Sequence, residues 1–88
     1  MKIKDGFILR EMLGQFIVVG EGLAQVNFNK MLSLNESAAY LWKEVKGREF
    51  TPEELVQLLL DRYEVTEEQA SADVRKLVDI WVEQGVAE

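Results

Sequence analysis

Hydrophobic and polar positions change their spacing about a third of the way along the chain. Residues 7–12 and 15–19 are short runs rich in β-branched and aromatic side chains, separated by Leu13 and Gly14. This pattern predicts a β-hairpin. After two further glycines and an irregular stretch, residues 31–34 are predicted to form a third short strand.

The apolar positions that follow recur at helical spacing, and each predicted helix has a start signal. Asn35 is a suitable N-cap for a helix over residues 36–45. Thr51 begins a capping box for a second helix that runs to about Tyr63, and Thr66 begins a third and longest helix. The apolar stripe of this last helix consists of Ala70, Val74, Leu77, Val78, Trp81 and Val82.

This order of elements predicts one α+β domain over residues 1–88, with three short N-terminal strands followed by three helices. No linker long enough to divide the chain is present. The second and third helices are joined by the short connection at residues 64–65, so a winged helix-turn-helix-like arrangement is expected.

Charge and composition narrow the functional classes. Ten Lys and Arg residues against 16 Asp and Glu residues give a net charge of −6, which repels phosphate backbones and anionic membrane surfaces. We therefore expect neither a nucleic-acid nor a membrane partner. Cysteine is absent, and no apolar run approaches the roughly 20 residues of a membrane span. We expect a cytoplasmic protein.

The residues needed for catalysis are scarce. Histidine is absent, so Ser33, Ser37 and Ser71 have no histidine base to activate them. The acidic pairs at residues 53–54 and 67–68 lie in predicted first helical turns, where negative charge complements the helix dipole. The protein is therefore expected to be no enzyme and to hold neither a cofactor nor a metal ion.

Two features point instead to binding. Ile80, Trp81 and Val82 are consecutive and cannot all face one core, so some apolar surface is expected near the end of the third helix. A short sheet also leaves a free edge, and residues 31–34 carry no charge or proline to prevent strand addition, although Lys30 precedes them. The alternative, a strand covered by its own protein, stays open at this point.

Several motifs in order resemble the PqqD family, over about residues 7–86. They are Leu34-Asn35-Glu36-Ser37-Ala38-Ala39-Tyr40-Leu41-Trp42, Phe50-Thr51-Pro52-Glu53-Glu54-Leu55, Asp61-Arg62-Tyr63-Glu64-Val65, Ala72-Asp73-Val74 and Gln84-Gly85-Val86.

The resemblance implies three strands followed by three helices, and a role as a recognition element for ribosomally made, modified peptides. Such a protein binds the leader of a precursor peptide as an added strand between the third strand and the third helix. It presents that peptide to a modifying enzyme, for which a radical S-adenosylmethionine enzyme is one candidate and pyrroloquinoline quinone synthesis one candidate pathway. Carried onto this sequence, the peptide-binding residues are Met31, Leu32 and Ser33 on the edge, and Val74, Leu77, Val78 and Trp81 on the helix.

Two other functions remain open from the residues alone. A winged-helix transcription regulator would fit the fold, but the net charge disfavours it. A small oligomerisation module, such as a homodimer formed through the free edge and the surface around Trp81, is the other alternative.

Overall fold

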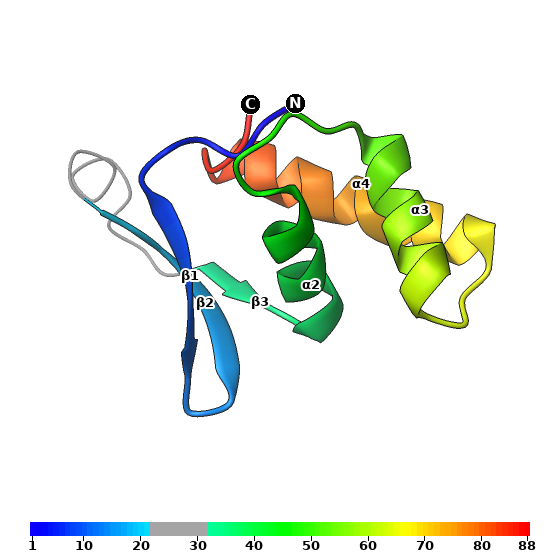
Figure 1. The fold of residues 1–88 in the computed structure, drawn as a ribbon, viewed down its shortest axis with the longest axis horizontal. Coiled ribbons are helices and arrows are strands. Elements are labelled where there is room, and N and C mark those ends of the chain that lie inside the picture. The colour runs from blue at the N-terminus through cyan, green and yellow to red at the C-terminus, as the bar shows by residue number, and fades with distance from the viewer. Residues whose placement is uncertain (22–31) are drawn as a thin grey trace.

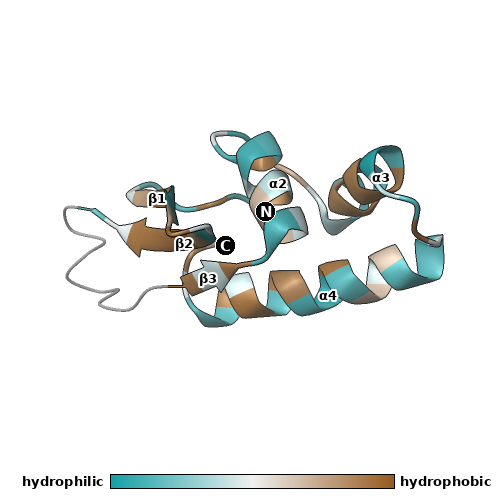
Figure 2. Cartoon of the chain, turned by 90° about the horizontal axis from the view of Figure 1, so that it is seen from below, coloured by the Kyte–Doolittle hydropathy of each residue, from teal (hydrophilic) through white to brown (hydrophobic). Residues whose placement is uncertain are grey.

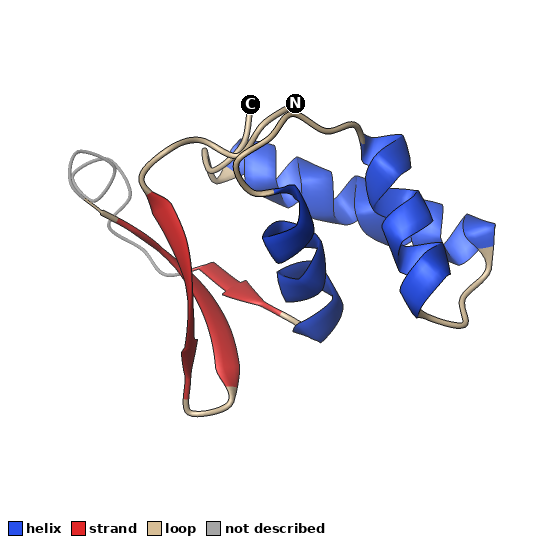
Figure 3. Cartoon of the chain, viewed as in Figure 1, coloured by secondary structure: helices blue, strands red, loops and turns tan. Residues whose placement is uncertain are grey.

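The structure is a computed structural model and describes residues 1–21 and 32–88. Among these described residues, three strands precede three helices, as predicted (Figures 1 and 3). The elements are β1 (Phe7–Met12), β2 (Gln15–Gly20), β3 (Leu32–Leu34), α2 (Glu36–Val45), α3 (Pro52–Arg62) and α4 (Glu67–Glu83). The predicted α+β class is confirmed, and the predicted bounds of the first strand and the first helix coincide with β1 and α2.

The strands form one antiparallel sheet in the order β1-β2-β3. Leu13 and Gly14 join β1 to β2 with φ angles of 52° and 77°. Two successive positive φ angles are what a type I′ hairpin turn requires. In the second pair of strands, Val18 lies opposite Leu32, and both side chains pack on the core side of the sheet. The sheet therefore contributes one apolar face to the core.

Each helix begins after a side chain that accepts a hydrogen bond from the backbone N–H three residues later. These bonds are Asn35 from Ala38 at 2.8 Å, Thr51 from Glu54 at 3.2 Å and Thr66 from Gln69 at 3.1 Å. Each cap typically contributes about 1 kcal/mol. Within residues 1–21 and 32–88, no helix is long and apolar enough to cross a membrane.

Aromatic side chains hold the helices together at the centre of the core. Trp42 and Trp81 are 1% and 0% exposed, and their ring centroids lie 5.5 Å apart with an interplanar angle of 89°. Phe50 meets Trp81 edge-on at 6.3 Å. Such edge-to-face pairs typically contribute about 0.5–1.5 kcal/mol beyond their burial. The three rings fix α4 against α2 and the segment between α2 and α3.

Backbone hydrogen bonds join the two terminal segments, which lie close together in Figure 1. The N–H of Lys2 donates to the carbonyl of Glu88 at 2.7 Å, and the N–H of Glu88 donates to the carbonyl of Lys2 at 2.9 Å. The N–H of Lys4 donates to the carbonyl of Val86 at 2.9 Å. This pairing attaches the segment that follows α4 to the N-terminal segment.

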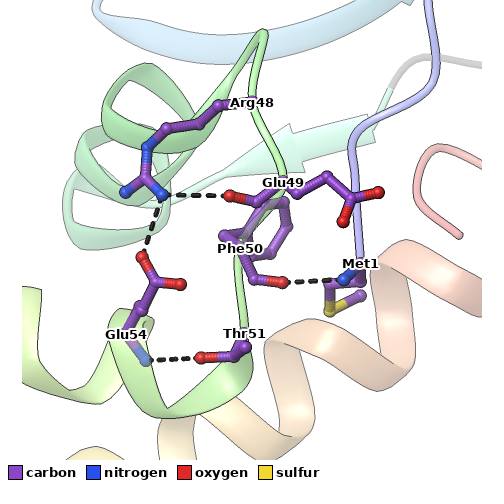
Figure 4. Close-up of polar contacts among 6 residues, drawn as sticks. All are labelled: Met1, Arg48, Glu49, Phe50, Thr51 and Glu54. Carbon is purple, nitrogen blue, oxygen red and sulfur yellow. Dashed lines mark hydrogen bonds and ion pairs between the residues drawn. The ribbon is translucent and has the colours of Figure 1, made fainter.

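Polar contacts hold the start of α3 (Figure 4). The guanidinium of Arg48 donates to the Glu54 carboxylate at 2.9 Å, and the amino group of Met1 donates to the carbonyl of Phe50 at 2.7 Å. The hydrogen bond from Arg48, helped by the backbone of Thr51, lowers the pKa of Glu54 below its ordinary value. Because Arg48 and Glu54 are nearly half exposed, water screens this ion pair and limits its contribution to stability.

Candidate peptide-binding groove

β3 forms one edge of the sheet. It pairs with β2 on one side, and no strand among the described residues pairs with its other side. Ser33 is exposed, whereas Leu32 is partly buried against the core. The described part of the strand thus presents backbone donors and acceptors with no charged side chain of its own beside them.

An apolar cavity begins where β3 ends and continues between α2 and α4. We call it the α2–α4 groove; it has a volume of about 240 Å³. Six of its ten lining residues are apolar and come from α2, α3 and α4, and the other four are polar. Its lining residues are Asn35, Ser37, Ala38, Leu41, Leu59, Asp73, Val74, Lys76, Leu77 and Ile80. Figure 2 shows the apolar residues that recur along α4.

Four of the predicted site residues lie at β3 or at this groove. Leu32 and Ser33 are on the edge strand, and Leu77 lines the groove in a partly buried position. Val74 also lines the groove but is only 2% exposed, so it forms the floor. Met31, the remaining predicted residue of the edge, lies outside the described residues.

Two predicted helix residues lie elsewhere. Val78 lines a separate cavity of about 330 Å³ between α3 and α4, together with Val56 and Asp79. Trp81 is fully buried among Trp42 and Phe50, so its side chain is not accessible to a peptide. The predicted apolar surface near the end of α4 is present, but Ile80 and Val82 form it, at 44% and 51% exposed.

The groove contains apolar residues that are not among the predicted peptide-binding residues. Ile80 lines it from α4 and Leu41 from α2, and Ala38 completes the wall on the α2 side. Ile80 follows Leu77 by three residues, a spacing that places both side chains on one helix face. That spacing could have identified Ile80 from the sequence, whereas the contribution of α2 depends on how the helices pack.

The described residues show no metal-binding cluster. Within residues 1–21 and 32–88, no group of three or more His, Cys, Asp or Glu side chains could hold a metal ion. The groove offers apolar contact beside a hydrogen-bonding strand edge.

Two solved structures have a similar fold. The fold is similar to that of TbiB1 in complex with the TbiA(beta) leader peptide, with a TM-score of 0.76 at 17% identity, covering 100% of the present sequence and 95% of TbiB1. It is also similar to that of lasso peptide synthetase B1 complexed with the leader peptide, with a TM-score of 0.72 at 20% identity, covering 99% of the present sequence and 95% of the synthetase subunit.

At 17% and 20% identity, these two similarities show a shared fold. No curated protein matches the sequence. A family model described as coenzyme PQQ synthesis protein D (PqqD) matches residues 15–87, which include β2, β3 and all three described helices. The chain belongs to the PqqD family.

Proposed function

We propose that this domain is a non-catalytic element that binds the leader of a ribosomally made precursor peptide and presents it to a modifying enzyme. The observation that carries the proposal is the edge strand β3 ending at an open apolar groove. An extended peptide would add to β3 as a further strand, with side chains directed into the α2–α4 groove.

Backbone and side-chain contacts would contribute differently to peptide binding. Main-chain hydrogen bonds to the edge strand provide affinity that depends little on peptide sequence. Alternate side chains of a strand point to the same side, so two apolar residues at alternate positions could contact Leu41, Leu77 and Ile80. We therefore place Leu32, Ser33, Leu77 and Ile80 at the peptide interface, with Val74 as its floor.

The similar folds support this assignment, because TbiB1 and lasso peptide synthetase B1 are both found with leader peptides. In this proposal the covalent chemistry belongs to a partner enzyme, for which a radical S-adenosylmethionine enzyme is one candidate. The family description makes pyrroloquinoline quinone synthesis one candidate pathway. The charge on α4 argues against a nucleic-acid role, since Glu67, Glu68, Asp73, Asp79 and Glu83 outnumber Arg75 and Lys76.

The proposal is tested by NMR titration of the isotope-labelled domain with synthetic leader peptides of candidate precursors encoded near its gene. We expect the amide resonances of Leu32 to Leu34 to shift together with those of Leu77 and Ile80. Titration without shifts at β3 would contradict strand addition.

Two variants on α4 test whether the peptide binds in the groove or on the surface beside it. Ile80→Asp puts a charge into the groove and should weaken binding roughly tenfold or more. Val82→Asp is the matched control, because Val82 is similarly exposed but does not line the groove. Its dissociation constant should stay within about twofold of the unmodified domain. Equal losses of peptide affinity in both variants would show that the groove is not part of the peptide interface.

A further inference from the structure

A second cavity adjoins the α2–α4 groove where β3 leads into α2. We call it the acidic pocket; its volume is about 340 Å³. It shares Asn35, Ser37, Leu59 and Asp73 with the groove, so the two cavities lie side by side. Its complete lining is Asn35, Glu36, Ser37, Leu59, Tyr63, Val65 and Asp73.

The acidic pocket has two carboxylates and no basic side chain in its lining. Glu36 and Asp73 are both exposed, and neither forms an ion pair within the described part of the chain. Lys76 lines the neighbouring groove, and the guanidinium of Arg62 lies over the rings of Tyr40 and Tyr63, 4.5 Å and 6.0 Å from their centroids. A cation bound in this pocket would therefore meet two carboxylates that form no ion pair with a described lysine or arginine.

The direction of β3 determines which part of a bound peptide reaches this pocket. The sheet is antiparallel throughout, and antiparallel pairing is the slightly more stable arrangement. β3 runs from Leu32 towards Asn35, so an antiparallel peptide would enter at the Asn35 end and leave at the Leu32 end. Residues that precede the apolar anchors of the peptide would thus lie at the acidic pocket.

We propose that the acidic pocket selects leader peptides with an arginine or lysine on the N-terminal side of their apolar anchor residues. This inference rests on the proposed function and adds the class of peptide that the site prefers. The basic side chain would extend over Leu59 and Tyr63 with its aliphatic part, while its charge faces Glu36 and Asp73. The apolar anchors occupy the α2–α4 groove.

The test uses a display library of random short peptides selected on the whole domain. We expect the selected peptides to share apolar residues at alternate positions, preceded by arginine or lysine. Replacing that basic residue with glutamate in a selected peptide should weaken binding to the unmodified domain by roughly tenfold, about threefold for each of two partly exposed charge pairs. The preference should also decrease at high salt.

Matched variants test whether the preference for a basic residue arises from the acidic pocket. In the double variant Asp73→Asn with Glu36→Gln, the preference for arginine over glutamate should fall below about twofold. The control Asp79→Asn with Glu53→Gln removes the same charge from α4 and from the first turn of α3, outside the acidic pocket. It should retain the preference.

The outcomes distinguish this inference from the function on which it rests. Selected peptides that shift the Leu32 to Leu34 resonances but bind equally well with arginine or glutamate would overturn the charge preference and leave peptide binding intact. A basic preference that persists in the Asp73 and Glu36 double variant, or that lies after the anchors, would also overturn it. Selected peptides that bind the domain but leave the resonances of β3 unperturbed would contradict strand addition to β3, on which the proposed function rests.

Discussion

Replacing Trp81 with alanine distinguishes a structural role from a binding role for this residue. The apolar stripe of the third predicted helix placed Trp81 in the peptide site, whereas the structure buries it completely. Its indole makes edge-to-face contacts with Trp42 at 5.5 Å and with Phe50 at 6.3 Å. Trp81→Ala would remove both contacts and leave a cavity between α4 and α2.

The expected loss is large compared with the stability of so small a domain. Truncating a buried tryptophan to alanine typically costs about 3–5 kcal/mol. At roughly 0.05–0.15 kcal/mol per residue, a protein of 88 residues has a free energy of unfolding of about 4–13 kcal/mol. The Trp81→Ala substitution should therefore remove at least about a fifth of that stability, and it should lower the urea midpoint by about 1 M or more.

Urea unfolding followed by far-UV circular dichroism measures this loss without relying on tryptophan fluorescence. Ile80→Ala is the control on the preceding residue, which is 44% exposed. It should cost less than about 1 kcal/mol. If Trp81→Ala also cost less than about 1 kcal/mol and instead weakened peptide binding, the placement of this indole in the core would be wrong.

Three other substitutions test local features of the fold. Tyr63→Phe should be neutral or stabilising by up to about 1 kcal/mol, because the buried Tyr63 hydroxyl has no hydrogen-bond partner among the described residues. A clear decrease in the urea midpoint would show that the hydroxyl is hydrogen-bonded. Glu54→Gln should lower stability slightly above pH 4.5, since the hydrogen bond from Arg48 lowers the pKa of Glu54 in the folded state. This difference should disappear as the pH falls through that lowered pKa, and a difference that grows in acid would contradict the assignment. Leu13→Asn should raise the thermal midpoint by a few degrees, because Leu13 is fully exposed with a φ of 52° and asparagine tolerates that conformation better. A lower midpoint would mean that Leu13 makes a stabilising contact.

Local signals were sufficient to predict the elements of the fold. Asn35, Thr51 and Thr66 are short polar residues placed just before apolar helical patterns, and each caps a helix in the structure. The run Phe7–Met12 carries the side chains that favour strands, and Leu13 with Gly14 matches a two-residue hairpin connection. These signals act within a few residues of one another, so they can be recognised without knowledge of the tertiary packing.

The faces of α4 could not be assigned in this way, because helical periodicity identifies an apolar arc without showing what covers each part of it. Val74 and Trp81 lie at the centre of this arc and are buried, while Leu77 and Val78 lie on its two flanks. Leu77 lines the α2–α4 groove, and Val78 lines the cavity that α4 forms with α3. The arc is therefore wider than the core requires. Its open flank, extended by Ile80, meets the cavity at the end of β3. The proposed peptide site therefore depends on contacts between elements, which hydropathy alone does not show.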